Sequence, residues 1–262
     1  MNAIASVVPL GVGRAGYREA VWSEWTKLVT LRSARILVAA LGLALPALSL
    51  IVAATGSLQA DDTILGASLL GGAALAQVLA GVLGASLITS EFKTGTIRIT
   101  LAACPRRLVV LAAKASVVAA ITFSITLVSG LVAYWIGLAM LDDGTYATGD
   151  AWPAVLGVAL AIASIGVLGV GIGTVVRHPA GAVSAVIGVV VLPGLLAPLL
   201  GEWQRWLGGT SLGGVMQKLT QSSDATHHAV GSLGAWPSLG VVAIYTTGVV
   251  LAAAWVLRHR DT

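Results

Sequence analysis

The sequence predicts an all-α membrane protein with six transmembrane helices, and three observations carry this prediction. Only 26 of the 262 residues are Asp, Glu, Lys or Arg, which is 10%, whereas soluble domains carry about 25%. Hydrophobic residues make up 57% of the chain, the mean hydropathy is +0.93, and the charges leave long charge-free windows between them. This composition excludes an ordinary soluble enzyme, a disordered chain and a soluble nucleic-acid-binding domain.

The charge-free windows are each long enough for the roughly 20 apolar residues that a helix needs to cross a bilayer. The first window, for example, contains the run ILVAALGLALPALSLIVAA. We expect a tail and an amphipathic interfacial helix in residues 1–35, and a six-span domain in residues 36–262. The predicted spans cover residues 36–55, 65–90, 109–135, 153–176, 180–200 and 237–257. The fifth span should kink or break near Pro193, because proline removes a backbone donor.

Basic residues gather on one side of these six spans. With a cytoplasmic N-terminus, 13 of the 15 Lys and Arg residues lie in cytoplasmic segments, and only Arg205 and Lys218 lie outside. The positive-inside rule therefore predicts that both termini are cytoplasmic. Five tryptophans would then lie at the outer ends of spans or in outer loops, as in an interfacial aromatic belt: Trp135, Trp152, Trp203, Trp206 and Trp236.

Small residues at four-residue spacing suggest that some spans pack closely. Ala76, Ala80 and Gly84 share one such pattern, and Gly169 and Gly173 share another. Small side chains let helix backbones approach each other in a membrane. Chance spacing in a chain rich in alanine and glycine explains any single pair equally well.

The predicted spans offer little to an intramembrane enzyme or an ion-coupled transporter. Lys114 is the one ionisable residue inside a span, and we expect it to snorkel towards the cytoplasmic surface. The sequence has no HExxH motif, no GxxxxGK[ST] phosphate loop and a single cysteine, Cys104. His227 and His228 are adjacent, which suits a metal site poorly. We therefore predict no catalytic, cofactor-binding or metal-binding residue, and energy for uphill transport would enter through another polypeptide.

The stretch from Tyr17 to Arg35 predicts an amphipathic helix. Trp22, Trp25 and Val29 recur at helical spacing, and charged residues including Glu24 and Lys27 occupy the other positions. Such a helix would lie along the inner membrane surface before the first span. A plain surface anchor fits the same pattern.

The loop from Glu91 to Arg107 is longer than a minimal hairpin between two spans needs. Gly95 could end one helix and Thr96 could cap the next, which would run over residues 97–103 and end at Pro105. Ile97, Ile99 and Leu101 are too apolar for a loop in water. We expect either a docking element for a partner or a segment lying on the bilayer surface.

At this loop the sequence resembles the type-2 ABC exporter permeases, and in particular actinobacterial members that export drugs or antibiotics. The resemblance rests on the run Glu91, Gly95, Thr96, Leu101, Pro105 and Lys114, which follows an E-x-x-x-G-T-x-x-x-x-L-x-x-x-P pattern. The N-terminal segments EWTKL and LRSAR also resemble the entry helix of these permeases. The similarity in topology extends over nearly the whole chain.

The resemblance implies that this chain, in a bacterial plasma membrane, pairs with a second permease copy or homologue and with two separate ATP-binding subunits, which carry ATP and Mg²⁺. Residues 96–103 would be the coupling helix, and Tyr17 to Arg35 the elbow helix that also touches the ATPase. Short extracellular helices would form between Gly201 and Trp236. The implied elbow residues are Trp22, Glu24, Trp25 and Lys27. The implied partner-coupling residues are Glu91, Gly95, Thr96, Ile97, Arg98, Ile99, Leu101 and Pro105.

These observations together predict a permease that exports a hydrophobic or amphiphilic compound such as a drug, a peptide antibiotic or a lipid. Carbohydrate exporters of the resembled family often line their channel with aromatic residues, and few are available here. The alternative prediction is a membrane anchor or scaffold that assembles a partner complex without passing a substrate. An intramembrane hydrolase is a more distant third.

Overall fold

The computed structural model describes residues 16–56, 62–97, 106–141, 144, 146–222 and 225–259, and this part of the chain is helical. The helices of the first half are α1 (Tyr17–Thr30), α2 (Arg32–Thr55), α3 (Ile64–Thr94), α5 (Arg107–Met140) and α6 (Ala151–Val176). Those of the second half are α7 (Pro179–Leu196), the 3₁₀ helix η1 (Ala197–Trp203), α8 (Gln204–Thr210), α9 (Leu212–Leu219), α10 (His227–Val230) and α11 (Ala235–His259). Within the described residues, the extended pairing is one isolated bridge between Thr63 and Ala147.

Six helical segments in the described residues are long and apolar enough to cross a membrane, and they are built on α2, α3, α5, α6, α7 and α11. The predicted all-α fold with six candidate spans is therefore confirmed. The first spanning helix starts earlier than predicted, since α1 ends at Thr30 and α2 begins at Arg32. Leu31 between them is extended (φ −72°, ψ 120°), which turns the chain from α1 into α2.

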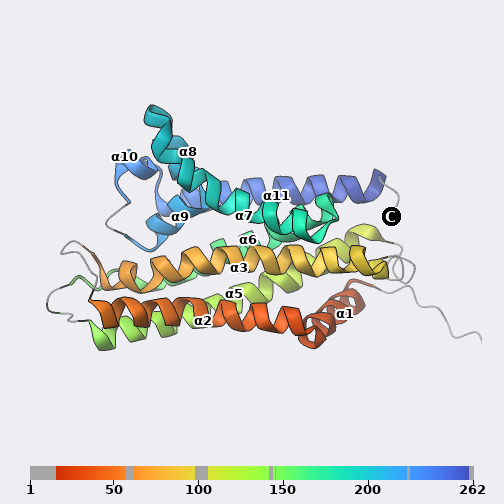
Figure 1. Ribbon diagram of the computed structural model, residues 1–262, viewed down its shortest axis with the longest axis horizontal. Coiled ribbons are helices and arrows are strands. Elements are labelled where there is room, and N and C mark those ends of the chain that lie inside the picture. Colours follow the sequence, from red (N-terminus) through yellow and green to blue (C-terminus); the bar gives the residue numbers. More distant parts are fainter. Residues whose placement is uncertain are drawn as a thin grey trace, which may run out of the picture.

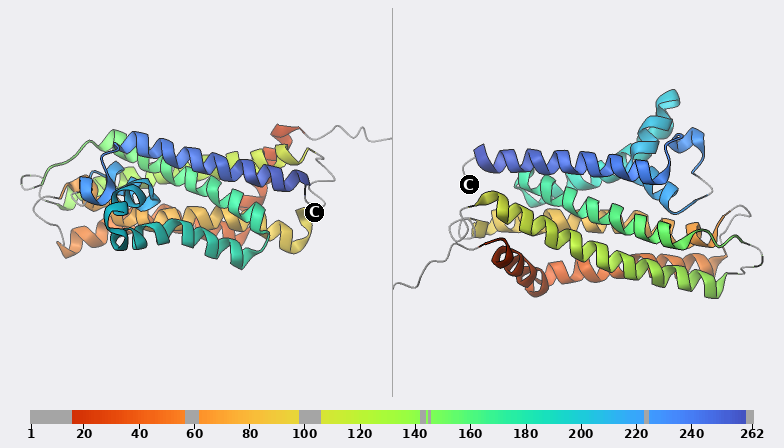
Figure 2. Two further views of the ribbon diagram at one scale, coloured as in Figure 1. Left: turned by 90° about the horizontal axis from the view of Figure 1, so that it is seen from above. Right: turned by 180° about the vertical axis from the view of Figure 1, so that it is seen from behind.

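The six long helices lie side by side and define two ends of a bundle (Figure 1). We call the end that carries α1 and the last turns of α3, α6 and α11 the charged end. The opposite end, with α8, α9, α10, the last turns of α2 and α5 and the first turns of α3 and α6, is the loop end. Figure 2 shows the same two ends from above and from behind.

Helix α6 is the most buried of the long helices, and its crossing with α3 depends on glycine. A Cβ on Gly84 of α3 would overlap the backbone of Gly166, and one on Gly169 of α6 would overlap the backbone of Gly81. A Cβ on Gly173 would lie 3.0 Å from the carbonyl oxygen of Ala85. The close packing predicted for Gly84, Gly169 and Gly173 is therefore present, and it holds α3 and α6 backbone to backbone.

Of the kink or break predicted near Pro193, a break is wrong, because α7 continues through Pro193 to Leu196. Proline has a helical φ and removes a single donor, so a helix can tolerate it. The chain instead departs from helical geometry at Gly201 inside η1, with φ 52° and ψ −119°. Glycine adopts this conformation without the steric cost that a Cβ would bring.

The segment between α7 and α11 forms the short helices that were predicted, but they are not all at the surface. The end of α7, η1 and α8 project away from the bundle (Figures 1 and 2). Helix α9 instead folds back, and its Leu212, Val215, Met216 and Leu219 are buried in the main hydrophobic core. Helix α9 is therefore part of the bundle core, whereas η1 and α8 project from it.

Candidate functional site

Four charged side chains from three helices meet at the charged end, and we call them the ionic cluster: Glu24 and Lys27 of α1, Glu91 of α3 and Lys114 of α5. Lys27 Nζ lies 2.6 Å from Glu24 Oε1 and 2.9 Å from Glu91 Oε1. Lys114 Nζ lies 2.8 Å from Glu91 Oε1 and also pairs with Glu24. The two acids and two bases thus alternate in a closed ring.

Helix α1 places its two cluster residues against the bundle and its tryptophans away from it. Glu24 and Leu28, one helical turn apart, are the buried residues of α1, whereas Trp22 and Trp25 are exposed. Leu28 belongs to a core cluster that also includes Leu87 and Leu111. This arrangement shows that the residue predicted on the polar face, Glu24, is the residue that faces the protein.

Tyr17, at the start of α1, forms a second polar contact between this helix and the bundle. Its hydroxyl, on Tyr17, lies 2.7 Å from Ser116 Oγ of α5. The contacts of Tyr17, Glu24 and Leu28 are spaced along the helix, so α1 is held to the bundle over most of its length.

The predicted snorkelling of Lys114 is wrong. Its side chain is 1% exposed and hydrogen-bonds to Glu24 and Glu91 within the protein. A buried ammonium group is costly unless it is paired and hydrogen-bonded, and two carboxylates meet that need here. These partners lie 90 and 23 residues away in sequence, so inspection of the span alone missed them. A lysine inside a span is itself a signal that an acid must be found for it.

The cluster is neutral as a whole, and Glu91 is shared by both lysines. Glu91 Oε1 accepts hydrogen bonds from Lys27 and Lys114, while Glu91 Oε2 is buried without a hydrogen-bond partner among the described residues. Burial alone would lower the pKa of Lys27. The hydrogen bond to Glu24 and the charge of Glu91 outweigh burial, so the pKa of Lys27 is raised. Lys27 is thus held charged by its two acidic neighbours.

A cavity of about 310 Å³ opens beside the ionic cluster. The wall of this cavity includes Lys27 from α1, Glu91 from α3 and Lys114 from α5. Thr96, from the predicted docking loop, lines it as well. The structure therefore brings one residue of the predicted elbow set and two of the predicted coupling set to the same cavity.

The start of the predicted docking loop has the local structure that its sequence indicated. Gly95 has φ +72° and ends α3, as predicted for the Gly-Thr pair. Thr96 and Ile97 are again helical, so Thr96 already has helical geometry and is not the cap that was predicted. The Thr96 hydroxyl lies 2.8 Å from the Thr94 hydroxyl. The side chain of Ile97 is buried within this chain, and its role in coupling stays a prediction.

The rest of the predicted coupling set lies outside the described residues: Arg98, Ile99, Leu101 and Pro105. Within the residues that the structure describes, no group of three His, Cys, Asp or Glu side chains could hold a metal ion. The ion pairs of the ionic cluster join α1, α3 and α5.

A comparison with protein-family models matches residues 3–261 to the family described as ABC-2 family transporter protein. A comparison with curated proteins gives no match. The family match covers nearly the whole chain and so includes the ionic cluster, the six candidate spans and the loop-end helices. The chain belongs to the ABC-2 transporter family and is a transmembrane permease subunit of an ABC transporter, working with an ATP-binding subunit.

Proposed function

We propose that this permease is driven by ATP hydrolysis on two copies of a separate ATP-binding subunit and exports a hydrophobic or amphiphilic compound from the cytoplasm or the inner leaflet. ATP and Mg²⁺ bind on the partner subunit, and a second permease copy or homologue completes the complex. The charged end faces the cytoplasm, because most of the basic residues lie in the segments that meet there.

The observation that carries this proposal is the ionic cluster, because it joins the predicted docking elements to two spans. Glu24 and Lys27 belong to the predicted elbow, and Glu91 lies five residues before Thr96, where the predicted coupling helix begins. A displacement that a partner imposes on α1 or on residues 96–103 reaches α3 and α5 through these ion pairs. A cation buried at 1% exposure cannot lose its acids cheaply, so the three helices move together.

Helix α3 then carries the displacement across the membrane. It has 31 residues, which corresponds to a length of about 46 Å at 1.5 Å per residue. Its glycine crossing with α6 couples it to the most buried helix of the bundle. Export requires that movement at the nucleotide-hydrolysing side changes the substrate path between the spans, and α3 provides a rigid connection for this.

The proposal is tested by ATP hydrolysis in proteoliposomes that contain the ATP-binding subunit with and without this chain. The permease should stimulate hydrolysis, and Ile99→Asp or Leu101→Asp should abolish the stimulation while membrane insertion is kept. Gly213→Asp in α9 is the matched control, since it adds the same charge where a Cβ would meet no atom within 4 Å. Equal stimulation by all three variants would contradict coupling through residues 96–103, and no stimulation by the unmodified chain would favour a scaffold.

A further inference from the structure

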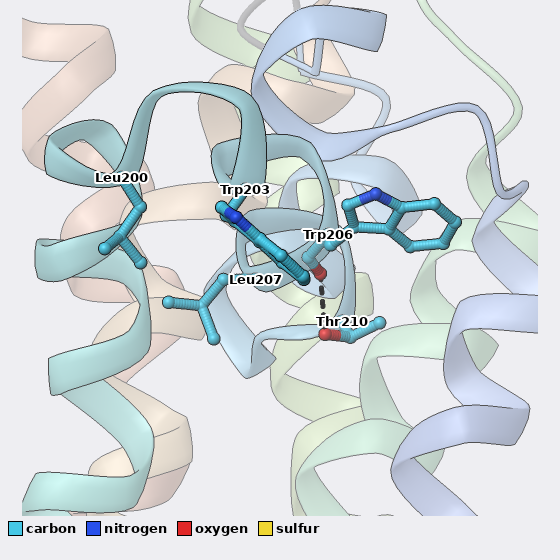
Figure 3. A pocket seen from close by; sticks show the side chains of 5 residues that line it. All are labelled: Leu200, Trp203, Trp206, Leu207 and Thr210. Atoms are coloured by element: carbon cyan, nitrogen blue, oxygen red, sulfur yellow. Dashed lines mark hydrogen bonds between the residues drawn. The ribbon is translucent and has the colours of Figure 1, made fainter.

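Two adjoining pockets lie at the loop end, and they share Trp206 and Thr210 as lining residues. The first, of about 450 Å³, is otherwise lined by Leu200, Trp203 and Leu207. Figure 3 shows these side chains around one apolar space, with a hydrogen bond from the Thr210 hydroxyl to the Trp206 carbonyl oxygen (2.8 Å). The second pocket, also of about 450 Å³, has two basic side chains in its wall, Arg205 and Lys218.

Lys218 is a half-buried cation whose hydrogen-bond partners are neutral. Its Nζ donates to the Gly209 carbonyl oxygen (3.2 Å) and to Ser238 Oγ (3.0 Å). An ammonium group has three donors, so one remains for a ligand. None of the described residues that line this second pocket is acidic, and burial lowers the pKa of Lys218. An anion placed beside Lys218 would supply the charge that its present partners lack.

The walls of the second pocket are held by close backbone contacts. A Cβ on Gly209 of α8 would overlap the carbonyl oxygen of Val230. Gly231 has φ +70°, and a Cβ there would lie 2.8 Å from the carbonyl oxygen of Arg205. Because α8 and the end of α10 meet this tightly, the pocket is formed before any ligand arrives, and little ordering free energy is lost on binding.

The apolar pocket is open to its surroundings. Trp203 and Trp206 are 71% and 63% exposed, and Leu200 is 45% exposed. Tryptophans of an interfacial belt contact lipid chains, so these side chains suit contact with an apolar tail. An apolar pocket beside a basic one matches a molecule with an apolar tail and an anionic head.

We propose that these two pockets together bind an anionic amphiphile, with its head group at Lys218 and Arg205 and its apolar tail against Trp206 and Trp203. The identity of this ligand as cargo rests on the proposed export function, and the site adds a negative charge to the proposed cargo class. An anionic lipid of the bilayer carries the same chemistry, and the experiment separates the two sources.

The test uses the full chain in phosphatidylcholine nanodiscs, without an ATP-binding subunit, and the fluorescent fatty acid 11-(dansylamino)undecanoic acid as probe. Binding should be saturable above the signal of empty nanodiscs. Lys218→Gln should weaken it about tenfold, the value of one charge-assisted hydrogen bond, and Lys218→Arg should restore it. Lys93→Gln, at an exposed lysine of the charged end, removes the same charge and should leave affinity unchanged. No saturable binding, or equal affinity of Lys218→Gln and the unmodified chain, would overturn the proposal.

A second variant keeps the test decisive if Lys218→Gln fails to fold. Trp206→Ala alters an exposed side chain that both pockets share, and it should also weaken the binding of the probe. Unchanged affinity in this variant would overturn the assignment of the tail.

Competition identifies the head group and the source of the ligand. Decyl phosphate should displace the probe and decyl phosphocholine should not, and equal displacement by both would overturn the requirement for a negative charge. Weaker probe binding in nanodiscs that contain phosphatidylglycerol would identify a resident lipid, whereas unchanged binding would identify cargo. Because no ATPase is present, failure here leaves ATP-driven transport standing, and failed ATPase stimulation leaves this binding site standing.

Discussion

Replacing one acid of the ionic cluster should release α1 from the bundle, and Glu24→Gln is the sharpest such change. Glu24 is buried and accepts hydrogen bonds from Lys27 and Lys114. The amide keeps the shape of the side chain but leaves two lysines with one carboxylate. Removing one partner of a buried ion pair costs about 3–5 kcal/mol. We take the lower limit, about 3 kcal/mol, because Lys27 is 32% exposed and water screens its share.

This cost should appear as faster hydrogen exchange along α1. A loss of about 3 kcal/mol in the free energy of local opening corresponds to exchange about 100-fold faster over residues 17–30. Glu19→Gln is the matched control on the same helix, since Glu19 is exposed and bonds only to the Gly16 amide among the described interactions. Glu19→Gln should change the free energy of local opening of α1 by no more than about 0.5 kcal/mol, apart from the residues next to the Gly16 contact. Hydrogen exchange of α1 peptides, detected by mass spectrometry on the protein in nanodiscs, measures both variants.

A double substitution separates the ion pair from mere packing. Lys114→Met combined with Glu24→Gln leaves the Lys27–Glu91 pair, which is neutral as a whole. The double variant should therefore cost less than the two single variants added together, by an interaction energy of about 1–3 kcal/mol. Equal protection of α1 from exchange in the Glu24→Gln and Glu19→Gln variants would show that the cluster does not hold α1. Simple additivity in the double variant would show the same. Either result refutes the coupling route through the cluster.

Three further outcomes follow from the geometry. Gly169→Ala should destabilise the bundle by about 1–3 kcal/mol in thermal unfolding followed by tryptophan fluorescence, because its Cβ meets backbone, whereas Gly240→Ala, with open space around it, should not. Gly201→Ala should loosen η1 and α8 in hydrogen exchange by about 1 kcal/mol, because φ is 52° there, while Gly194→Ala in open space should not. The raised pKa of Lys27 means that its contribution is complete below its ordinary value of 10.5 and is lost as the pH rises through the higher folded value. The protection factor of α1, which is the observed exchange rate corrected for base catalysis of amide exchange, should fall only above about pH 10.5, and a fall near neutral pH would contradict this.

Features that depend on neighbouring residues could be predicted from the sequence, and those that depend on distant ones could not. Six spans follow from local hydropathy, and the end of α3 at Gly95 follows from a single Gly-Thr pair. The environment of Lys114 depends on Glu24, 90 residues away. The burial of α9 depends on contacts of Leu219 and its neighbours with other helices, although the same apolar pattern suits a membrane surface. The residue type at Pro193 predicted the wrong position for the break in the helix. The chain leaves helical geometry at Gly201, because glycine can adopt the positive φ that is found there.

Helix α3 connects the two sites, and this connection bears on how a partner could control a pocket at the opposite end. At the charged end, Glu91 of α3 holds Lys27 and Lys114. At the loop end, the Thr63 hydroxyl caps α3 through the Gly66 amide (2.9 Å) and donates to the Gln221 carbonyl oxygen (3.4 Å), three residues beyond Lys218. The backbone contact between Gly84 and Gly166 prevents α3 from moving without α6. An axial shift of α3 imposed at Glu91 must therefore be accommodated at the end of α9, which is the element that positions Lys218 in its pocket.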